Sequence, residues 1–391
     1  MKFLCDSNNL QKSINIVEKA ISQRTTLPAL ENIFLETRGN QLVLRGNDLE
    51  IGIEAKSEIS NSSGDSSILV KAKTISSIVS KLQNQQISIS VDERNKMDIK
   101  AEKVDFDILC SPSSDYPVFP SVQKGVGFSI SVENFKKLIK YTVFSVSFDE
   151  TKNFLNGILM DKENDRLSFV ATDGYRLSLK THEIDSIPNN FSAIVPYKAM
   201  NEWYRIMQNI DSKEILEVNV TDKQITFKLG DIIMVSRTIE GNFPDYRNVI
   251  PKETENGFIV SRRLLLDASE RASIIASESN NVVRFNFTDA QLNIVANAAT
   301  MGDFNEDLSL TRTKGSGEVK PAFNIRLVLD VLKVIEDDDI KLEFNNGLSP
   351  CLVKPVLDDD YTYIIMPIRT SEFIKEETSN EEKEKVTENV T

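Results

Sequence analysis

Hydrophobic positions follow the same pattern in three successive parts of the chain. Each part begins with a leading Phe, and a second apolar anchor follows seven residues later. These anchors form the pairs Phe3 and Leu10, Phe128 and Phe135, and Phe258 and Leu265. In the first part Leu10, Ile14, Val17 and Ile21 have the spacing of one apolar helix stripe. The pattern therefore predicts an amphipathic helix at the start of three internal repeats.

Alternating strands and a second helix complete each repeat. Ile87, Ile89 and Val91 alternate with polar residues, as Leu216, Val218 and Val220 do, which is typical of half-buried strands. Comparable turns at 46–48, 171–173 and 296–298 are 125 residues apart in both intervals. We therefore predict an α+β protein with three tandem copies of one domain, each with two helices packed on antiparallel sheets. The expected domains span residues 1–124, 125–254 and 255–370, and an acidic tail at 371–391 is expected to be disordered.

Length and composition agree with a globular protein. The chain has 391 residues, of which 40% are hydrophobic and 27% are charged. It has neither an apolar run of about 18 residues nor a secretory start, so we expect no membrane partner and a cytoplasmic location. Cys5, Cys110 and Cys351 are too scattered for a disulfide framework or a metal site, and they are expected to be core residues.

The net charge of −13 is unevenly distributed. The six predicted helices are Asn8 to Arg24, Lys71 to Leu82, Glu133 to Ser147, Pro196 to Asn209, Arg262 to Ser277 and Asn324 to Ile335. Together they carry a balance of +10, so the rest of the chain carries −23. For a single helix, lysines that only add solubility would explain such a balance. Six helices of one sign in an acidic protein predict a surface that meets phosphates without reading bases.

No catalytic constellation is visible. His182 is the only histidine, and there is no nucleophile elbow, phosphate loop or His/Cys metal cluster. The acidic runs at 337–339 and 358–360 could bind a divalent ion, but such runs are usually solvated loops. We therefore expect no catalytic residues, no metal and no cofactor.

Three motifs carry a specific resemblance. They are Ala171-Thr172-Asp173-Gly174-Tyr175-Arg176-Leu177, Gly241-Asn242-Phe243-Pro244-Asp245-Tyr246 and the ending Met366-Pro367-Ile368-Arg369. With the three repeats, they make residues 1–369 similar to the bacterial sliding clamp, the beta subunit of DNA polymerase III. The resemblance implies a head-to-tail homodimeric ring with the DNA-clamp fold, which encircles duplex DNA at the nucleoid and gives the polymerase processivity without catalysis of its own. The implied partners are the polymerase alpha subunit, a clamp-loading ATPase and other proteins with a clamp-binding motif.

The resemblance and the helix charges together give the candidate site residues. Those expected to bind DNA are Arg24, Lys73, Lys136, Lys137, Lys140, Lys198 and Arg205. A partner-peptide groove between the second and third domains would comprise Leu155, Thr172, Gly174, Tyr175, Arg176, Leu177, Pro244, Val249, Asn324, Leu348, Ile364, Met366, Pro367, Ile368 and Arg369. Its aliphatic walls and Met could take Leu and Phe side chains of a short peptide. The loop at 149–154 departs from the family pattern, so its role at DNA stays open.

The dimer contact would join the first and third domains. The expected interface residues are Ile78, Leu82, Phe106, Ile108, Ile274 and Ile275. A basic edge with Arg94, Lys96, Lys100 and Lys103 would face an acidic edge with Asp303, Glu306 and Asp307, which favours head-to-tail closure.

Two other functions are compatible with parts of this pattern. One is a homodimeric peptide-binding scaffold that does not encircle DNA, and the basic excess of the helices argues against it. The other is a metal nuclease, for which no site is visible. A separate hypothesis is that Phe373 and Ile374 of the tail fold back over the neighbouring peptide groove.

Overall fold

The computed structural model describes residues 1–22, 25–184 and 189–369. The described chain forms two compact units. The first unit comprises Met1–Lys136, Glu163–Asp165 and Ile184–Glu240, and the second comprises Lys137–Lys162, Arg166–Glu183 and Gly241–Thr391. Both units thus include strands from the predicted central domain, because each half of that domain shares a sheet with a neighbouring repeat.

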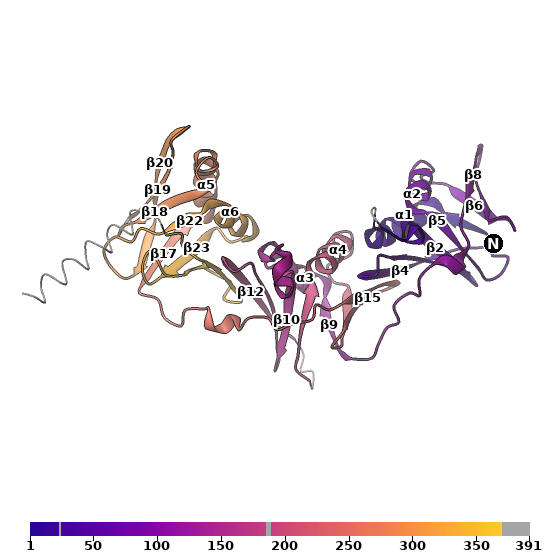
Figure 1. Cartoon of the computed structure of the whole chain (residues 1–391), viewed down its shortest axis with the longest axis horizontal. Helices are drawn as coiled ribbons and strands as arrows, with labels where there is room; N and C mark the ends of the chain where they lie inside the picture. Colours follow the sequence, from indigo (N-terminus) through magenta and orange to yellow (C-terminus); the bar gives the residue numbers. More distant parts are fainter. Residues whose placement is uncertain (23–24, 185–188, 370–391) are drawn as a thin grey trace, which may run out of the picture. The chain divides into compact units, whose positions relative to one another are not determined.

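The order of elements repeats three times (Figure 1). The first repeat contains β1 (Lys2–Asp6), α1 (Ser7–Val17), β2 (Asn32–Arg38), β3 (Gln41–Asn47), β4 (Ile51–Glu58), β5 (Ser66–Lys71), α2 (Ala72–Val79), β6 (Gln86–Val91), β7 (Lys96–Ala101) and β8 (Val104–Leu109). The second contains β9 (Val126–Ser131), α3 (Val132–Lys140), β10 (Gly157–Glu163), β11 (Arg166–Thr172), β12 (Arg176–Glu183), β13 (Phe191–Pro196), α4 (Tyr197–Met207), β14 (Ile215–Val220), β15 (Gln224–Leu229) and β16 (Ile232–Arg237). The third contains β17 (Asn256–Ser261), α5 (Arg262–Ala276), β18 (Val282–Phe287), β19 (Gln291–Ala298), β20 (Gly302–Ser309), β21 (Thr311–Lys314), β22 (Ala322–Asn324), α6 (Ile325–Val334), β23 (Asp339–Phe344), β24 (Cys351–Pro355) and β25 (Tyr361–Ile365).

The sheets follow the same plan in each unit. In the first unit one sheet has the order β1-β6-β7-β8, and an eight-stranded sheet has the order β5-β2-β3-β4-β16-β15-β14-β9. In the second unit the orders are β20-β19-β18-β22 and β10-β11-β12-β25-β24-β23-β17-β21. Helices α1 and α2 pack against each other in the first unit, and α5 and α6 do so in the second. Every strand pair for which a register is known is antiparallel, so the predicted α+β class is confirmed.

Strand registers match residue by residue between repeats. The rows of directly opposed residues are Phe3-Ile89-Ile99-Phe106, Phe128-Val218-Phe227-Met234 and Phe258-Leu342-Val353-Tyr363. In the other half of each repeat, Gly46 is opposite Ile53, Ala171 is opposite Ser178, and Ala296 is opposite Phe304. Equivalent positions in the three repeats are therefore defined by hydrogen bonding and not only by spacing.

Two predicted helices are shorter than their hydrophobic pattern indicated. Asp6 caps α1 by accepting hydrogen bonds from the amides of Asn8 and Asn9, and Leu10, Ile14 and Val17 are buried, but α1 ends at Val17 and leaves Ile21 outside. Helix α3 ends at Lys140 and not at Ser147. There the backbone of Thr142 leaves the helical region, and its hydroxyl donates to the carbonyl of Leu138 over 2.7 Å.

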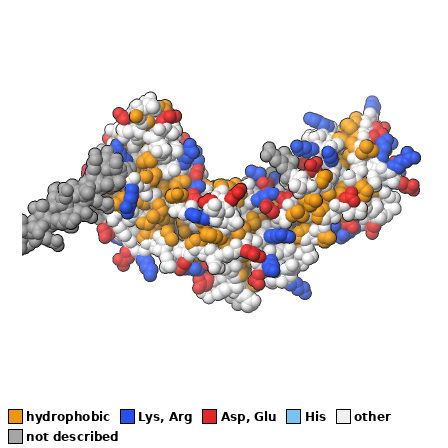
Figure 2. Space-filling model, in the orientation of Figure 1, with side chains coloured by type: hydrophobic (Ala, Val, Ile, Leu, Met, Phe, Trp, Pro, Cys, Tyr) orange, Lys and Arg blue, Asp and Glu red, His pale blue; other side chains and the backbone are white. Residues whose placement is uncertain are grey.

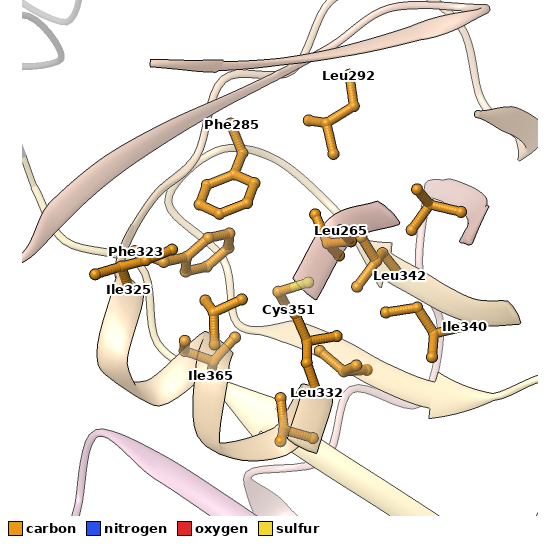
Figure 3. Packing of buried hydrophobic residues seen from close by; sticks show 14 of the residues in the cluster. Leu265, Phe285, Leu292, Phe323, Ile325, Leu332, Ile340, Leu342, Cys351 and Ile365 are labelled. Carbon is orange, nitrogen blue, oxygen red and sulfur yellow. The ribbon is translucent and has the colours of Figure 1, made fainter. Parts of the chain in front are cut away.

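The second unit has a continuous apolar core (Figure 3). Leu265 of α5 and Leu332 of α6 meet Phe285 and Phe323 from the small sheet, while Cys351 contributes from the large sheet. Aromatic rings extend this core, with Phe258 4.7 Å from Phe287 and 5.6 Å from Phe344 between ring centroids. Helices and both sheets of this unit are thus fixed to one another by burial.

A segment after β8 is fastened to the large sheet of the first unit. The Arg45 guanidinium lies 5.4 Å from the ring centroids of both Phe34 and Phe119 and bonds Glu54 over 2.7 Å. Gly52 permits this contact, because a Cβ there would lie 3.0 Å from the Phe119 ring. The neighbouring Val118 remains 94% exposed.

Candidate functional site

A tight turn between β11 and β12 forms one part of the predicted groove. The Thr172 hydroxyl donates to the carbonyl of Arg176 over 2.5 Å and accepts from the Gly174 amide. Asp173 accepts hydrogen bonds from the amides of Tyr175 and Arg176. The φ of Gly174 is 90°, a conformation that glycine adopts without strain. The Thr-Asp-Gly sequence therefore determines this turn locally.

Arg176 is held by three separate groups. Its Nε donates to Asp173 over 3.0 Å, and its two terminal nitrogens donate over 2.5 Å to Asp330 of α6 and to the carbonyl of Phe144. The guanidinium carbon also lies 5.5 Å from the centroid of the Phe144 ring. Only 10% of the Arg176 side chain is exposed. This arginine thus joins the turn to α6 and to the short helix η4 (Val143–Ser145).

The large apolar side chains at the groove differ in exposure. Tyr175 is 71% exposed, Val249 41% and Met366 37%, whereas Leu155, Leu177 and Ile364 are buried. The amide of Met366 donates to the carbonyl of Tyr175 over 2.9 Å, and Leu177 is opposite Ile364 in the sheet. Among the remaining predicted members, Gly174, Pro244 and Arg369 are exposed and Thr172 is buried. The other four are partly buried: Asn324, Leu348, Pro367 and Ile368. The exposed set can contact a ligand, and the buried set supports it from below.

Other segments of the groove are held by polar bonds. The hydroxyl of Tyr246 and the guanidinium of Arg247 both donate to Asp161, which fixes the segment that contains Pro244 and Val249. Asn324 caps α6 by accepting from the Arg326 amide. Burial and the nearby Asp161 carboxylate raise the pKa of Tyr246 to about 12, so its hydroxyl stays protonated and able to donate.

Several of the predicted DNA-binding residues have acidic partners. Lys140 pairs with Glu336 over 2.5 Å, Lys198 pairs with Asp48, and Arg205 pairs with Glu202 over 2.9 Å. Lys73 and Lys136 have no ion-pair partner among the residues that the structure describes, and Lys137 is exposed on α3. Arg24 lies outside the described residues. The partners of Lys140 and Lys198 are not visible in the sequence, because they lie 196 and 150 residues away, whereas Glu202 lies in the same helix as Arg205.

Two of the predicted interface residues, Phe106 and Ile108, lie on the edge strand β8, and the others lie in or just after the helices α2 and α5. In the described chain β8 and β20 each have a neighbour on one side only. Phe106, Ile108, Ile78 and Ile275 are half-buried and Ile274 is 61% exposed, but Leu82 is only 3% exposed and belongs to the core. Sequence reasoning missed Leu109, which is 84% exposed at the end of β8, and Met301, which is 50% exposed beside β20.

The predicted basic edge is largely neutralised within its own sheet. Lys96 pairs with Asp107 over 2.7 Å and Lys100 with Asp98 over 2.8 Å. Figure 2 shows acidic and basic side chains mixed over the β6–β8 end of the first unit. On β20, Glu306 bonds Arg271 and Asp303 accepts from Asn297. The charge contrast between the two edges is therefore weaker than the sequence indicated.

Of the two acidic runs considered as metal ligands, the one at 358–360 forms ion pairs, and Asp337 of the other accepts a hydrogen bond from the Leu357 amide. Asp358 bonds Lys180 over 2.5 Å, and Asp360 bonds Arg166 over 3.0 Å. Within residues 1–22, 25–184 and 189–369, no group of three or more His, Cys, Asp or Glu side chains could hold a metal ion. In the same ranges, no helix is both long enough and apolar enough to cross a membrane.

Comparison with known proteins gives a consistent family. Residues 1–120, 129–245 and 247–369 match the N-terminal, central and C-terminal domains of the DNA polymerase III beta subunit. The beta sliding clamp of Bacillus subtilis is 30% identical over 381 residues, which cover 95% of this chain and 100% of that protein, and the one from Staphylococcus aureus is 29% identical over 378 residues, with the same coverage.

Solved structures agree with the sequence matches. A sliding clamp from Bacillus subtilis has a TM-score of 0.89 at 29% identity, and it covers 95% of this chain and 99% of that one. A sliding clamp from Pseudomonas aeruginosa bound to griselimycin has a TM-score of 0.90 at 27% identity, with 95% and 100% coverage. Because the matches extend over all three repeats and the full length of the relatives, the chain belongs to the beta sliding clamp family of DNA polymerase III.

Proposed function

We propose that two copies of this chain close head-to-tail into a ring around duplex DNA and tether the replicative polymerase, which makes the protein a processivity factor and not an enzyme. The family membership supports this role. The observation that carries the ring itself is the pair of open edges at β8 and β20.

The internal repeats indicate how these edges would pair. Strands β4 and β16 are antiparallel neighbours in the first unit, and β12 and β25 are antiparallel neighbours in the second. By repeat equivalence, β20 corresponds to β4 and β12, while β8 corresponds to β16 and β25. The third junction of this kind would pair β8 with β20, and in the described chain neither strand has a neighbour on that side. A second copy of the chain would supply the missing strand. Six such junctions close a ring of two chains.

Repeat equivalence also gives a register for the proposed junction. Met234 is opposite Ile53, and the equivalent residue Tyr363 is opposite Ser178. The corresponding third-junction residues are Phe106 in β8 and Phe304 in β20. We therefore expect Phe106 of one copy directly opposite Phe304 of the other. Cross-strand aromatic pairs of this kind stabilise antiparallel sheets by about 0.2–1 kcal/mol.

Apolar contact, not edge charge, would drive closure. In this register Asp107 is opposite Asp303, so the facing strands bring two acids together. Lys96 already bonds Asp107, and Asn297 bonds Asp303, which leaves both carboxylates with partners. The exposed side chains of Leu109 and Ile274 supply apolar surface beside the junction.

DNA would be held by topology and by weak phosphate contacts. Lys73 of α2 and Lys137 of α3 are exposed, and Lys136 of α3 is partly buried. Lys140, Lys198 and Arg205 would meet phosphates only in competition with their own carboxylates. Basic residues that are shared between DNA phosphates and protein carboxylates would bind no single phosphate tightly, which would allow the ring to slide.

Partner proteins would dock through a short peptide at the groove with Tyr175, Val249 and Met366. The exposed apolar surface fits Leu and Phe side chains. Candidate partners are the polymerase alpha subunit, the clamp loader that opens the ring and other proteins with a clamp-binding motif. In this role the three repeats act as domains at 1–124, 125–254 and 255–370, and the ring works at the nucleoid in the cytoplasm.

A disulfide across the proposed junction tests encirclement. Phe106→Cys and Phe304→Cys are combined in a Cys110→Ser background and oxidised in the presence of nicked circular DNA. We expect a covalent dimer that stays on the circle in 1 M salt and is released when the circle is cut. Asp105→Cys with Phe304→Cys is the control, because its side chains lie on opposite sheet faces and should crosslink poorly. A covalent dimer equally retained on linear and circular DNA would contradict encirclement and favour the peptide-binding scaffold.

A further inference from the structure

We infer that Asp330, which lies outside the predicted groove, is a positioning residue for partner binding, and that it acts through Arg176. This inference rests on the proposed peptide-binding function of the groove. It differs from the sequence-based expectation, in which Arg176 itself contacts the peptide.

The first step is that Arg176 has few donors left for a ligand. Its Nε and both terminal nitrogens already donate to Asp173, Asp330 and the Phe144 carbonyl. The side chain is 10% exposed and lies against the Phe144 ring. These bonds use three of the five N–H donors of the guanidinium, and the burial of the side chain leaves a peptide little access to the other two. Arg176 is therefore a structural link in this site.

Arg176 holds the turn between β11 and β12 against α6. Asp173 receives the Arg176 side chain and also bonds the amides of Tyr175 and Arg176. The carbonyl of Tyr175 in turn accepts from the amide of Met366. Tyr175 and Met366 are two of the large exposed apolar side chains of the groove. Their backbone positions thus depend on the turn that Arg176 ties to α6.

Asp330 is the residue of α6 that bonds the Arg176 guanidinium. Its carboxylate is 43% exposed, and it is the acceptor that α6 offers to Arg176. Tyr363, whose ring is 6.0 Å from that of Phe144, donates to the Leu327 carbonyl of the same helix. Without the Asp330 charge, Arg176 would keep its bonds to the turn but lose its ionic bond to α6. The turn could then shift relative to the helix, and the groove would be less preorganised for a peptide.

A carboxylate in the equivalent turn of the first unit also bonds a cation. Asp48 occupies the position in the first repeat that Asp173 occupies in the second. It caps its own turn by accepting from the amides of Glu50 and Ile51, and it bonds Lys198 of α4. In both units a cation joins the turn of one repeat to the second helix of the next repeat, although the cation comes from the helix in one and from the turn in the other. This recurrence supports a positioning role for the ion pair.

The test measures binding of a fluorescein-labelled peptide that carries Leu and Phe anchors. We expect Asp330→Asn to weaken binding by about 5- to 30-fold, the range that a lost charge-assisted hydrogen bond gives. Asp360→Asn is the matched control, because it removes the Arg166 ion pair at the opposite end of β11 and should leave peptide affinity unchanged. Melting temperatures of all variants are measured alongside.

A double-mutant cycle shows whether Asp330 acts through Arg176. Arg176→Gln and the Arg176→Gln/Asp330→Asn double variant should bind the peptide equally weakly. Unchanged affinity of Asp330→Asn, or an additive loss in the double variant, would overturn the inference. If the native protein itself fails to bind the peptide, the proposed groove function is wrong, and that result is distinct from the failure of Asp330 alone.

Discussion

At the scale of single residues, some of the basic side chains expected to bind DNA join distant segments of the chain instead. Lys198 and Lys140 were expected to meet DNA, yet Lys198 bonds Asp48 and Lys140 bonds Glu336. The helix balance of +10 is therefore an upper limit on the charge available to phosphates. A clamp with such divided lysines would bind DNA weakly at each contact, which is compatible with sliding.

The Lys140 and Glu336 pair gives a pH prediction. The hydrogen bond from Lys140 lowers the pKa of Glu336 below its usual value, so the folded state favours the ionised carboxylate. The stabilisation is fully present above the unfolded pKa of about 4.5 and is lost as the pH falls through the lower folded value. Glu336→Gln should thus be slightly less stable than the native protein at pH 7, by less than about 1 kcal/mol for an exposed pair. Urea unfolding at pH 7 and pH 3.5 checks this, and an equal difference at both pH values would contradict it.

At the scale of elements, the two open edges are the most informative feature. A strand edge with free amides and carbonyls pairs readily with another chain unless it is covered. Edge β8 ends in Leu109, which is 84% exposed, and α5 presents Ile274 beside β20. Both features fit a subunit interface better than a solvent-facing edge.

Substitution of an interface residue should separate the subunits. Ile274→Asp replaces exposed apolar surface that would be buried in the dimer, so we expect the dimer dissociation constant to rise at least about tenfold. Val118→Asp is the matched control, because Val118 is 94% exposed and the neighbouring Phe119 packs against Gly52 of β4 and not against β8. Sedimentation at several protein concentrations measures the effect. A dimer that is equally stable in Ile274→Asp and the native protein would place the interface elsewhere.

At the scale of the whole molecule, the tail at 371–391 lies beyond the part of the chain that matches the family model. The C-terminal domain match ends at residue 369, and the relatives align over their full length with 95% of this chain. Phe373 and Ile374, which were expected to fold over the neighbouring groove, lie outside the described residues. The hypothesis stays a prediction, and it concerns only this chain and not the family.

Removal of the tail tests that hypothesis. If Phe373 and Ile374 compete with partners, deletion of residues 371–391 should tighten peptide binding several-fold, and Phe373→Ala/Ile374→Ala in the full chain should do the same. The acidic charge is kept in the double variant, so a difference between the two variants separates apolar competition from charge. Unchanged peptide affinity in both would remove the idea.

Local sequence determined the repeating elements of this protein. Helix and strand periodicity marked six helices and the alternating strands, because burial of one face is visible in short windows. The Thr172-Asp173-Gly174 turn was also readable, since its bonds are made within five residues. Hydrophobic periodicity did not predict where α3 ends. Apolar residues continue beyond Lys140, but the Thr142 hydroxyl bonds the Leu138 carbonyl and the backbone leaves the helix there.

Tertiary structure alone decided which of these residues are available for function. Four apolar residues were expected to contact a partner, but strands and helices from distant parts of the chain bury them: Leu82, Leu155, Leu177 and Ile364. The sequence predicted that Arg176 contacts a ligand. In the structure it bonds Asp330, which is 154 residues away, and the carbonyl of Phe144, which is 32 residues away. The open edges of β8 and β20 likewise follow from strand order and not from composition. Burial, ion pairing and edge exposure depend on residues far apart in sequence, so periodicity could define the elements but not their surfaces.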